Sequence, residues 1–185
     1  MRQEIMLSGF GGQGLVLGGI ILAEAAVVYD GKNATHNQSY GPEARGGACR
    51  SEVIISDQDI KYPEIQNPDL FLAMTQDAVN KIGNRIKPTG VAIVDPEFVR
   101  DLTPLAAAKA VYQVPITQIA REVTGRTITG NMVALGVIST LTGVVGKEAI
   151  EAAIMERVPP QTREMNKKAL YAGFAAGEEA KKQLP

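Results

Sequence analysis

The sequence predicts an α/β fold, a three-layer sandwich with a mainly parallel sheet, a glycine-rich first strand-to-helix turn and a helix-rich C-terminal third. Three observations predict it. Short apolar runs of strand length alternate with helical segments, a glycine cluster joins the first run to the first helix, and only helical patterns follow residue 115. With 185 residues, no internal repeat and no linker, the chain fits a single domain over residues 1–185.

The first elements are a strand, a glycine turn and a helix. The short apolar run Glu4–Ser8 leads into Gly9-Phe-Gly-Gly-Gln-Gly14. Leu15–Tyr29 is rich in Leu, Ile and Ala and apolar nearly all round, which predicts a buried helix. Asp30-Gly31 ends this helix, because glycine commonly follows a helix C-terminus.

The middle of the chain predicts further strands, with one amphipathic helix over Gln76–Ile86. Three Gly and one Pro make Tyr40–Gly47 a loop, because these residues break regular structure. The predicted strands are Lys32–Ser39, Cys49–Ser56, Asp69–Ala73, Val91–Val94 and Ala110–Val114.

Helices fill the C-terminal third. Pro115 opens a helix that runs to about Val123, and a long apolar helix covers Asn131–Val145, with Asn131 as its cap and Gly136 as a close-packing point. The glycines around this helix mark helix boundaries, because neither spacing matches a phosphate-binding P-loop.

Two shorter predictions complete the chain. A helix runs from Gly146 to about Arg157, and Pro159-Pro160 ends it. Residues 162–183 form a polar final helix that is expected to pack on a partner. Its apolar positions at helical spacing are Met165, Ala169, Leu170 and Phe174.

Composition excludes several classes of function. The formal net charge of −1 provides no electrostatic footprint for nucleic acid. A single Cys forms no internal disulfide, and one Cys with one His cannot supply an iron–sulfur cluster or a structural zinc site. We therefore expect no metal site and assign no catalytic residue.

The N-terminus predicts a cytoplasmic protein. Residues 1–7 read as a strand, without the basic and apolar regions of a secretory leader. The longest apolar stretch, Leu15–Ala23, is shorter than the roughly 20 residues that a membrane span requires.

The glycine turn matches the dinucleotide-binding fingerprint and has a strand before it and a helix after it. A nicotinamide site also needs an acidic residue at the end of the second strand, but Asp30 precedes that strand and Thr35–Gln38 holds no acid. Gln13 adds a side chain that a phosphate cradle does not need. Three interpretations stay open: a bound dinucleotide, a tight turn for helix packing, and a backbone surface for another ligand or subunit.

The loop Tyr40–Gly47 places Glu43 and Arg45 between glycines. Arg45 offers a planar fork of donors for phosphate or carboxylate, whereas an internal Glu43–Arg45 pair would only stabilise the loop. His36 and Cys49 flank the loop, but a Cys–His nucleophile pair would need them in contact, and a lone Cys is more often a buried apolar residue.

Three segments carry a family resemblance: Gly9–Gly14, Ser39–Gly47 and Asn131–Gly136. Together they resemble the gamma subunit of 2-oxoacid:ferredoxin oxidoreductases over about residues 3–180. The amino-acid sequence of the second segment is most similar to the 2-oxoglutarate type. The resemblance implies a complex that converts a 2-oxoacid, coenzyme A and oxidised ferredoxin into acyl-CoA, CO2 and reduced ferredoxin.

The resemblance also implies a division of labour. Thiamine diphosphate and magnesium belong to alpha and beta subunits, and iron–sulfur clusters belong to the beta or a ferredoxin-like delta subunit. This chain has no Gly-Asp-Gly for thiamine diphosphate and too few cysteines for a cluster, so the isolated chain is expected to be inactive.

The site hypothesis places Gly11, Gly12, Gln13, Gly14 and Arg45 on the coenzyme A side of that complex or at a subunit interface. The backbone N–H groups of the glycine turn and the Arg45 guanidinium are donors suited to phosphates. Two competing hypotheses are a free-standing nucleotide-binding protein and a purely structural scaffold subunit.

Overall fold

The computed structural model describes residues 1–40 and 48–183, and it contains a six-stranded sheet of strand order β2-β3-β1-β4-β5-β6. Arg45 and Glu43 lie outside the described residues. The strands are β1 (Arg2–Phe10), β2 (Asn33–Tyr40), β3 (Ala48–Ser56), β4 (Leu70–Ala73), β5 (Val91–Val94) and β6 (Ala110–Gln113). The helices are α1 (Leu15–Glu24), α2 (Gln76–Ile82), α3 (Ile116–Thr124), α4 (Gly130–Thr142), α5 (Lys147–Arg157) and α6 (Arg163–Lys181).

The sheet is mixed, and one strand runs against the rest. The pairs β1–β4, β4–β5 and β5–β6 are parallel, whereas β3 is antiparallel to both of its neighbours, β1 and β2. Five strands therefore point the same way, in agreement with the predicted mainly parallel sheet. The exception is β3, which pairs with β2, and such an antiparallel pair needs no crossover helix because its strands can be joined by a short connection.

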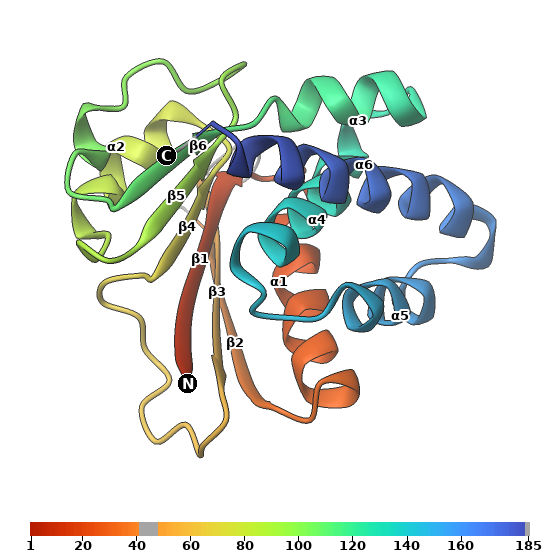
Figure 1. The fold of residues 1–185 in the computed structure, drawn as a ribbon, viewed down its shortest axis with the longest axis horizontal. Helices are drawn as coiled ribbons and strands as arrows, with labels where there is room; N and C mark the ends of the chain where they lie inside the picture. Colours follow the sequence, from red (N-terminus) through yellow and green to blue (C-terminus); the bar gives the residue numbers. More distant parts are fainter. Residues whose placement is uncertain (41–47, 184–185) are drawn as a thin grey trace.

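Helices cover both faces of the sheet, which confirms the α/β fold (Figure 1). Helices α1, α3, α4, α5 and α6 pack on one face, and α2 packs on the other. The alternation of side chains along β1 sends Ile5 and Leu7 into the larger core and Met6 into the smaller one. The predicted helix-rich C-terminal third supplies most of the larger layer.

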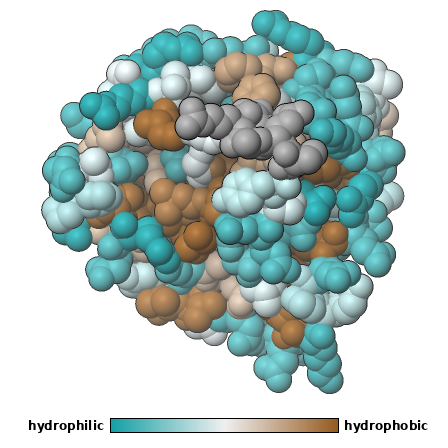
Figure 2. Space-filling view, turned by 180° about the vertical axis from the view of Figure 1, so that it is seen from behind, coloured by the Kyte–Doolittle hydropathy of each residue, from teal (hydrophilic) through white to brown (hydrophobic). Residues whose placement is uncertain are grey.

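The first helix differs from its prediction in shape and burial. It is α-helical to Glu24 and continues as a π-helical turn over Ala25–Tyr29, and Gly31 follows with φ +64°. The prediction that this helix is buried is wrong at its C-terminal end, where Val27, Val28 and Tyr29 are 47%, 66% and 45% exposed. Figure 2 shows apolar surface on this side of the molecule, where α1 and its extension lie.

The final helix, α6, packs along α4 of the same chain. A Cβ on Gly136 of α4 would lie 2.4 Å from the Leu170 carbonyl oxygen, and one on Gly173 of α6 would lie 2.1 Å from the Val133 oxygen. Only glycine allows the two backbones to approach this closely. Gly136 is confirmed as a close-packing point, and α6 needs fewer large apolar residues because its contact is made by small ones.

The helix boundaries include one wrong prediction. Asn131 does not cap α4, because the helix begins at Gly130 after Thr129, and Asn131 lies buried in its first turn. The boundary glycines behave as predicted: Gly125 and Gly143 end α3 and α4 in the left-handed conformation. Within the described part of the chain, no helix combines the length and apolarity that a membrane span requires.

Candidate functional site

The direction of the connections creates a crevice at the carboxyl ends of the parallel strands. The chain leaves β1 for α1 on one face and leaves the adjacent β4 for α2 on the other (Figure 1). In open α/β sheets, ligands bind at such a switch point. A cavity of about 300 Å³ lies there.

Two walls of this cavity come from distant parts of the sequence. Gly11, Gly12 and Gln13 of the glycine turn form one wall, and Thr117 and Arg121 of α3 contribute to the other. Parallel pairing of β1, β4, β5 and β6 brings them together, because it places the ends of these strands at one edge. Thr127, Ile128 and Gly130 close the cavity where α4 begins.

The glycine turn is held by its own glutamine. Gln13 Oε1 accepts a hydrogen bond from the Phe10 N–H at 2.7 Å, and Gln13 Nε2 donates to the Met74 carbonyl at 3.4 Å. Gly12 and Gly14 adopt φ values of +99° and +74°, a region that favours glycine. The N–H groups of Gly11 and Gly12 donate to no acceptor among the residues that the structure describes.

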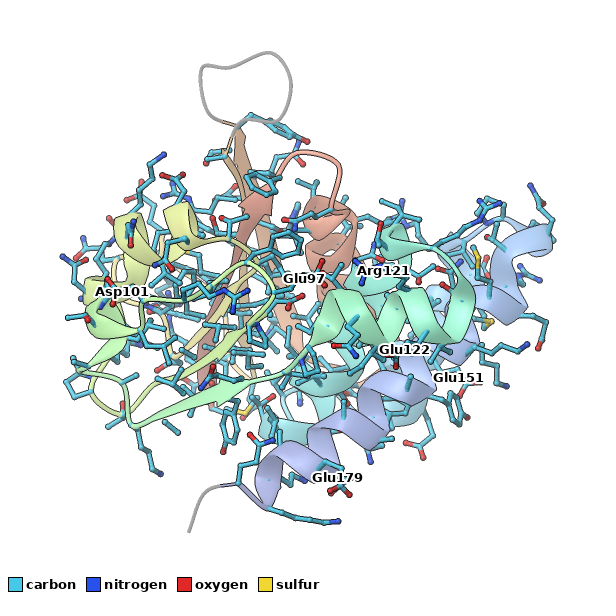
Figure 3. The ribbon with its side chains drawn as sticks, turned by 90° about the horizontal axis from the view of Figure 1, so that it is seen from above. Glu97, Asp101, Arg121, Glu122, Glu151 and Glu179 are labelled. Carbon is cyan, nitrogen blue, oxygen red and sulfur yellow. The ribbon has the colours of Figure 1, made fainter. Side chains whose placement is uncertain are left out.

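Arg121 supplies the cationic side of the cavity. Its Nη2 donates to Glu97 Oε1 at 2.9 Å, and Figure 3 shows the two side chains next to each other. The hydrogen bond to Glu97 raises the pKa of Arg121 above its ordinary value. The pair is exposed to solvent, so it holds Arg121 only weakly and leaves the guanidinium available to an anion.

A buried carboxylate fixes the start of α3. Asp95, which follows β5 and is fully buried, accepts hydrogen bonds from the N–H groups of Glu97 and Thr117 at 3.0 and 2.8 Å. Asp95 thereby fixes the backbone that carries Glu97 and the first turn of the helix that carries Arg121.

The predicted site residues separate into three groups. Gly11, Gly12 and Gln13 line the cavity, Gly14 lies behind them at the start of α1, and Arg45 lies outside the described residues. The sequence interpretation missed Arg121, although one signal was available. Arg121 follows the last predicted strand within a helix opened by a proline, and such a helix starts at the same sheet edge as the glycine turn.

The structure disfavours a bound dinucleotide. Asp30 Oδ2 accepts the Gly146 N–H at 2.8 Å, which places Asp30 at the start of α5. Asp30 also lies at the far end of the first helix, roughly 20 Å from the glycine turn. The acid that would hold a ribose is therefore occupied elsewhere.

The Cys–His pair does not form. The register of β2 and β3 sets His36 opposite Val53, about 13 Å along the strand from Cys49, and His36 Nε2 is 2.9 Å from Ser51 Oγ. Burial raises the pKa of the Cys49 thiol and lowers the pKa of His36, so neither group is activated for nucleophilic chemistry. Among the described residues, no three His, Cys, Asp or Glu side chains form a group that could hold a metal ion.

Comparison with known proteins agrees with the resemblance found in the sequence. A sequence model of the pyruvate ferredoxin/flavodoxin oxidoreductase family matches residues 4–176. The 2-oxoglutarate synthase subunit KorC of Methanocaldococcus jannaschii is 45% identical over 179 residues, 97% of this chain and 96% of the relative. KorC of Methanothermobacter marburgensis is 46% identical over 177 residues, 94% of this chain and 95% of the relative.

A solved structure extends this similarity to the fold. The gamma subunit of the keto/oxoacid ferredoxin oxidoreductase from Geobacter sulfurreducens superposes with a TM-score of 0.86 at 45% identity. The match covers 97% of this chain and 98% of the gamma subunit. The chain therefore belongs to the pyruvate ferredoxin/flavodoxin oxidoreductase family, and its homologues are subunits of 2-oxoacid:ferredoxin oxidoreductases.

Proposed function

We propose that this chain is the gamma subunit of a thiamine-dependent 2-oxoglutarate:ferredoxin oxidoreductase in the cytoplasm. The complex would convert 2-oxoglutarate, coenzyme A and oxidised ferredoxin into succinyl-CoA, CO2 and reduced ferredoxin. The observation that carries this proposal is the near-complete mutual coverage between the chain and 2-oxoglutarate synthase subunits.

The residues of this chain do not fit the redox cofactors of such a complex. The only thiol, Cys49, is buried in β3, and the sequence contains no Gly-Asp-Gly to hold thiamine diphosphate and magnesium. We therefore assign thiamine diphosphate, magnesium and the iron–sulfur clusters to alpha, beta and delta partner subunits. The isolated chain would neither transfer electrons to ferredoxin nor bind the 2-oxoacid productively.

The surface of the chain supports a role inside a complex. Helix α1 has no polar face, yet Val16 and Ile20 stay partly exposed, and Val27 and Val28 extend this apolar side into the π-helical turn. Apolar surface of this kind is typical of subunit contacts.

The cavity at the switch point is the proposed coenzyme A side of the subunit. Coenzyme A carries phosphates, and the cavity offers the N–H groups of Gly11 and Gly12, which have no acceptor in the described part of the chain, with the Arg121 guanidinium on the other wall. Backbone donors together with a guanidinium are well suited to phosphate oxygens. Arg45 is proposed as a second guanidinium for the same anion.

The test is Arg121→Ala and Arg45→Ala in the assembled complex, with Arg2→Ala as a matched control. Arg2 is also an exposed arginine paired with a glutamate, Glu4, and it lies at the start of β1, away from the glycine turn. Loss of a charge-assisted phosphate contact should raise the KM for coenzyme A about tenfold in the two test variants while kcat changes little.

Three outcomes separate the competing functions. An unchanged KM for coenzyme A with intact assembly would contradict the coenzyme A assignment and favour a scaffold. Loss of assembly alone would make the arginine an interface residue. Saturable binding of NAD, FAD or ATP to the isolated chain, measured by calorimetry, would favour a free-standing nucleotide-binding protein.

A further inference from the structure

The four glycines of the turn have different surroundings. A Cβ added to Gly9 would lie 2.1 Å from Gln13 Oε1 and 3.0 Å from Met74 Cβ, and one added to Gly14 would lie 2.5 Å from Asn131 Nδ2. A Cβ on Gly12 would meet nothing within 4 Å. The outer glycines thus make room for two amide side chains, whereas the inner ones face the cavity.

Gln13 fixes the turn to the sheet. Its side chain bonds the Phe10 N–H at the end of β1 and the Met74 carbonyl after β4, so it joins the two strands between which the crevice opens. The Gln13 backbone N–H also donates to the Phe10 carbonyl at 3.3 Å, which closes the turn.

Asn131 fixes the turn from the opposite side. It is 5% exposed, its Nδ2 donates to the Gly14 carbonyl at 3.2 Å, and its Oδ1 accepts the Met132 N–H at 2.9 Å. The Gly14 carbonyl also accepts the Gly18 N–H at 2.9 Å inside α1. Asn131 therefore connects the first turn of α4 to the exit of the glycine turn.

We propose that Gln13 and Asn131 are positioning residues that hold the Gly11–Gly12 backbone in its anion-binding conformation. Gly9 and Gly14 serve this arrangement by admitting the two amides, and Gly11 and Gly12 present the N–H groups. The effect on coenzyme A rests on the proposed function, whereas the effect on the conformation of the turn does not.

The test compares Gln13→Met and Asn131→Leu with the same substitutions at matched positions. Both keep side-chain volume and remove the hydrogen bonds. Gln76→Met is the control for glutamine, since Gln76 also binds a loop through backbone groups, at Arg100, Asp101 and the Asp101 carbonyl. Asn166→Leu is the control for asparagine, since Asn166 is 7% exposed and donates to the Thr162 carbonyl.

Two measurements are made on the assembled complex. Hydrogen exchange at the amides of residues 13 and 18 reports the shape of the turn, because neither amide bonds to the substituted side chains. Exchange at these amides should become about fivefold faster in both test variants and stay unchanged in the controls. The KM for coenzyme A should rise about tenfold, with kcat and the KM for 2-oxoglutarate within twofold of the parent complex.

Each outcome decides the proposal. Unchanged exchange in the test variants overturns it, whatever happens to the KM. Faster exchange with an unchanged KM for coenzyme A, while Arg121→Ala still raises that KM, also overturns it, because the turn would then not serve the site. Faster exchange in a complex where Arg121→Ala has no effect leaves the two amides as positioning residues and removes coenzyme A as the ligand. If Asn131→Leu fails to assemble, Asn131→Ser replaces it in both measurements.

Discussion

Two cavities of about 300 Å³ lie at opposite ends of the central sheet, and they differ in what their walls offer a ligand. At the carboxyl ends of the parallel strands, the wall is a glycine turn whose Gly11 and Gly12 N–H groups have no acceptor within residues 1–40 and 48–183. At the amino ends, the wall carries Glu4 and Lys87, and Lys87 Nζ lies 3.1 Å from Glu4 and 2.9 Å from Asp69.

The difference shows that the volume of a cavity does not by itself indicate a ligand-binding site. The charges at the amino end neutralise one another, and Arg2 adds a second cation 2.9 Å from Glu4. An anion would have to break this network before it could bind. The backbone donors at the carboxyl end have no such competitor among the described residues, so the two ends are expected to respond differently to substitution.

The largest expected effect comes from a matched pair of glycines. A Cβ on Gly9 or on Gly90 would lie within about 3 Å of its surroundings, and Gly90 lies at the amino end, against the Asp69 and Lys87 carbonyls. Overpacking should lower the free energy of unfolding by about 2 kcal/mol in both Gly9→Ala and Gly90→Ala, measured by urea denaturation. Only Gly9→Ala should raise the KM for coenzyme A, and an equal rise in both variants would remove the distinction between the two ends.

Lys87→Met should affect stability and leave catalysis unchanged. It removes the cation shared by Glu4 and Asp69, and partly exposed ion pairs of this kind contribute about 1 kcal/mol. Urea denaturation of the variant measures the loss, and the activity of the assembled complex serves as the control. A raised KM for coenzyme A in Lys87→Met would indicate a ligand site at the amino end.

The contribution of Lys87 should also depend on pH. Burial lowers the pKa of Lys87, but the hydrogen bonds to Asp69 and Glu4 outweigh it and raise the pKa above 10.5 in the folded protein. A raised folded-state pKa stabilises the protein below the unfolded value and is lost as the pH rises through the folded value. The stability difference between the parent chain and Lys87→Met should therefore be constant near neutral pH and shrink above pH 10.5. A difference that grew with pH would contradict this pairing.

The smallest expected effect concerns Cys49, which pairs with Gly9 across β1 and β3 behind the glycine turn. Cys49 is 4% exposed, and burial raises the pKa of its thiol. Alkylation by iodoacetamide in the folded protein should be at least about tenfold slower than in urea. Equal rates would mean that the strand end behind the turn opens readily.

Much of the fold follows from local pattern. The predicted strand Val91–Val94 matches the observed one, and helix ends at Gly125 and Gly143 follow from glycine's tolerance of the left-handed conformation. The three segments Gly9–Gly14, Ser39–Gly47 and Asn131–Gly136 also predicted the correct family. The prediction from sequence is wrong where long-range contacts decide the role of a residue. Asn131 resembles a helix cap in sequence, but its amide is used by Gly14, a residue far away in the chain.

The sequence by itself determined the alternation of strands and helices, the glycine turn and the absence of cysteines for a cluster, because these depend on residue type and short spacing. Only the tertiary structure decided which ends of the strands meet, that Arg121 faces Gly11 and Gly12, and that two amides occupy the space left by Gly9 and Gly14. The physical reason is that parallel pairing brings together segments more than a hundred residues apart, and local propensity carries no information about that pairing.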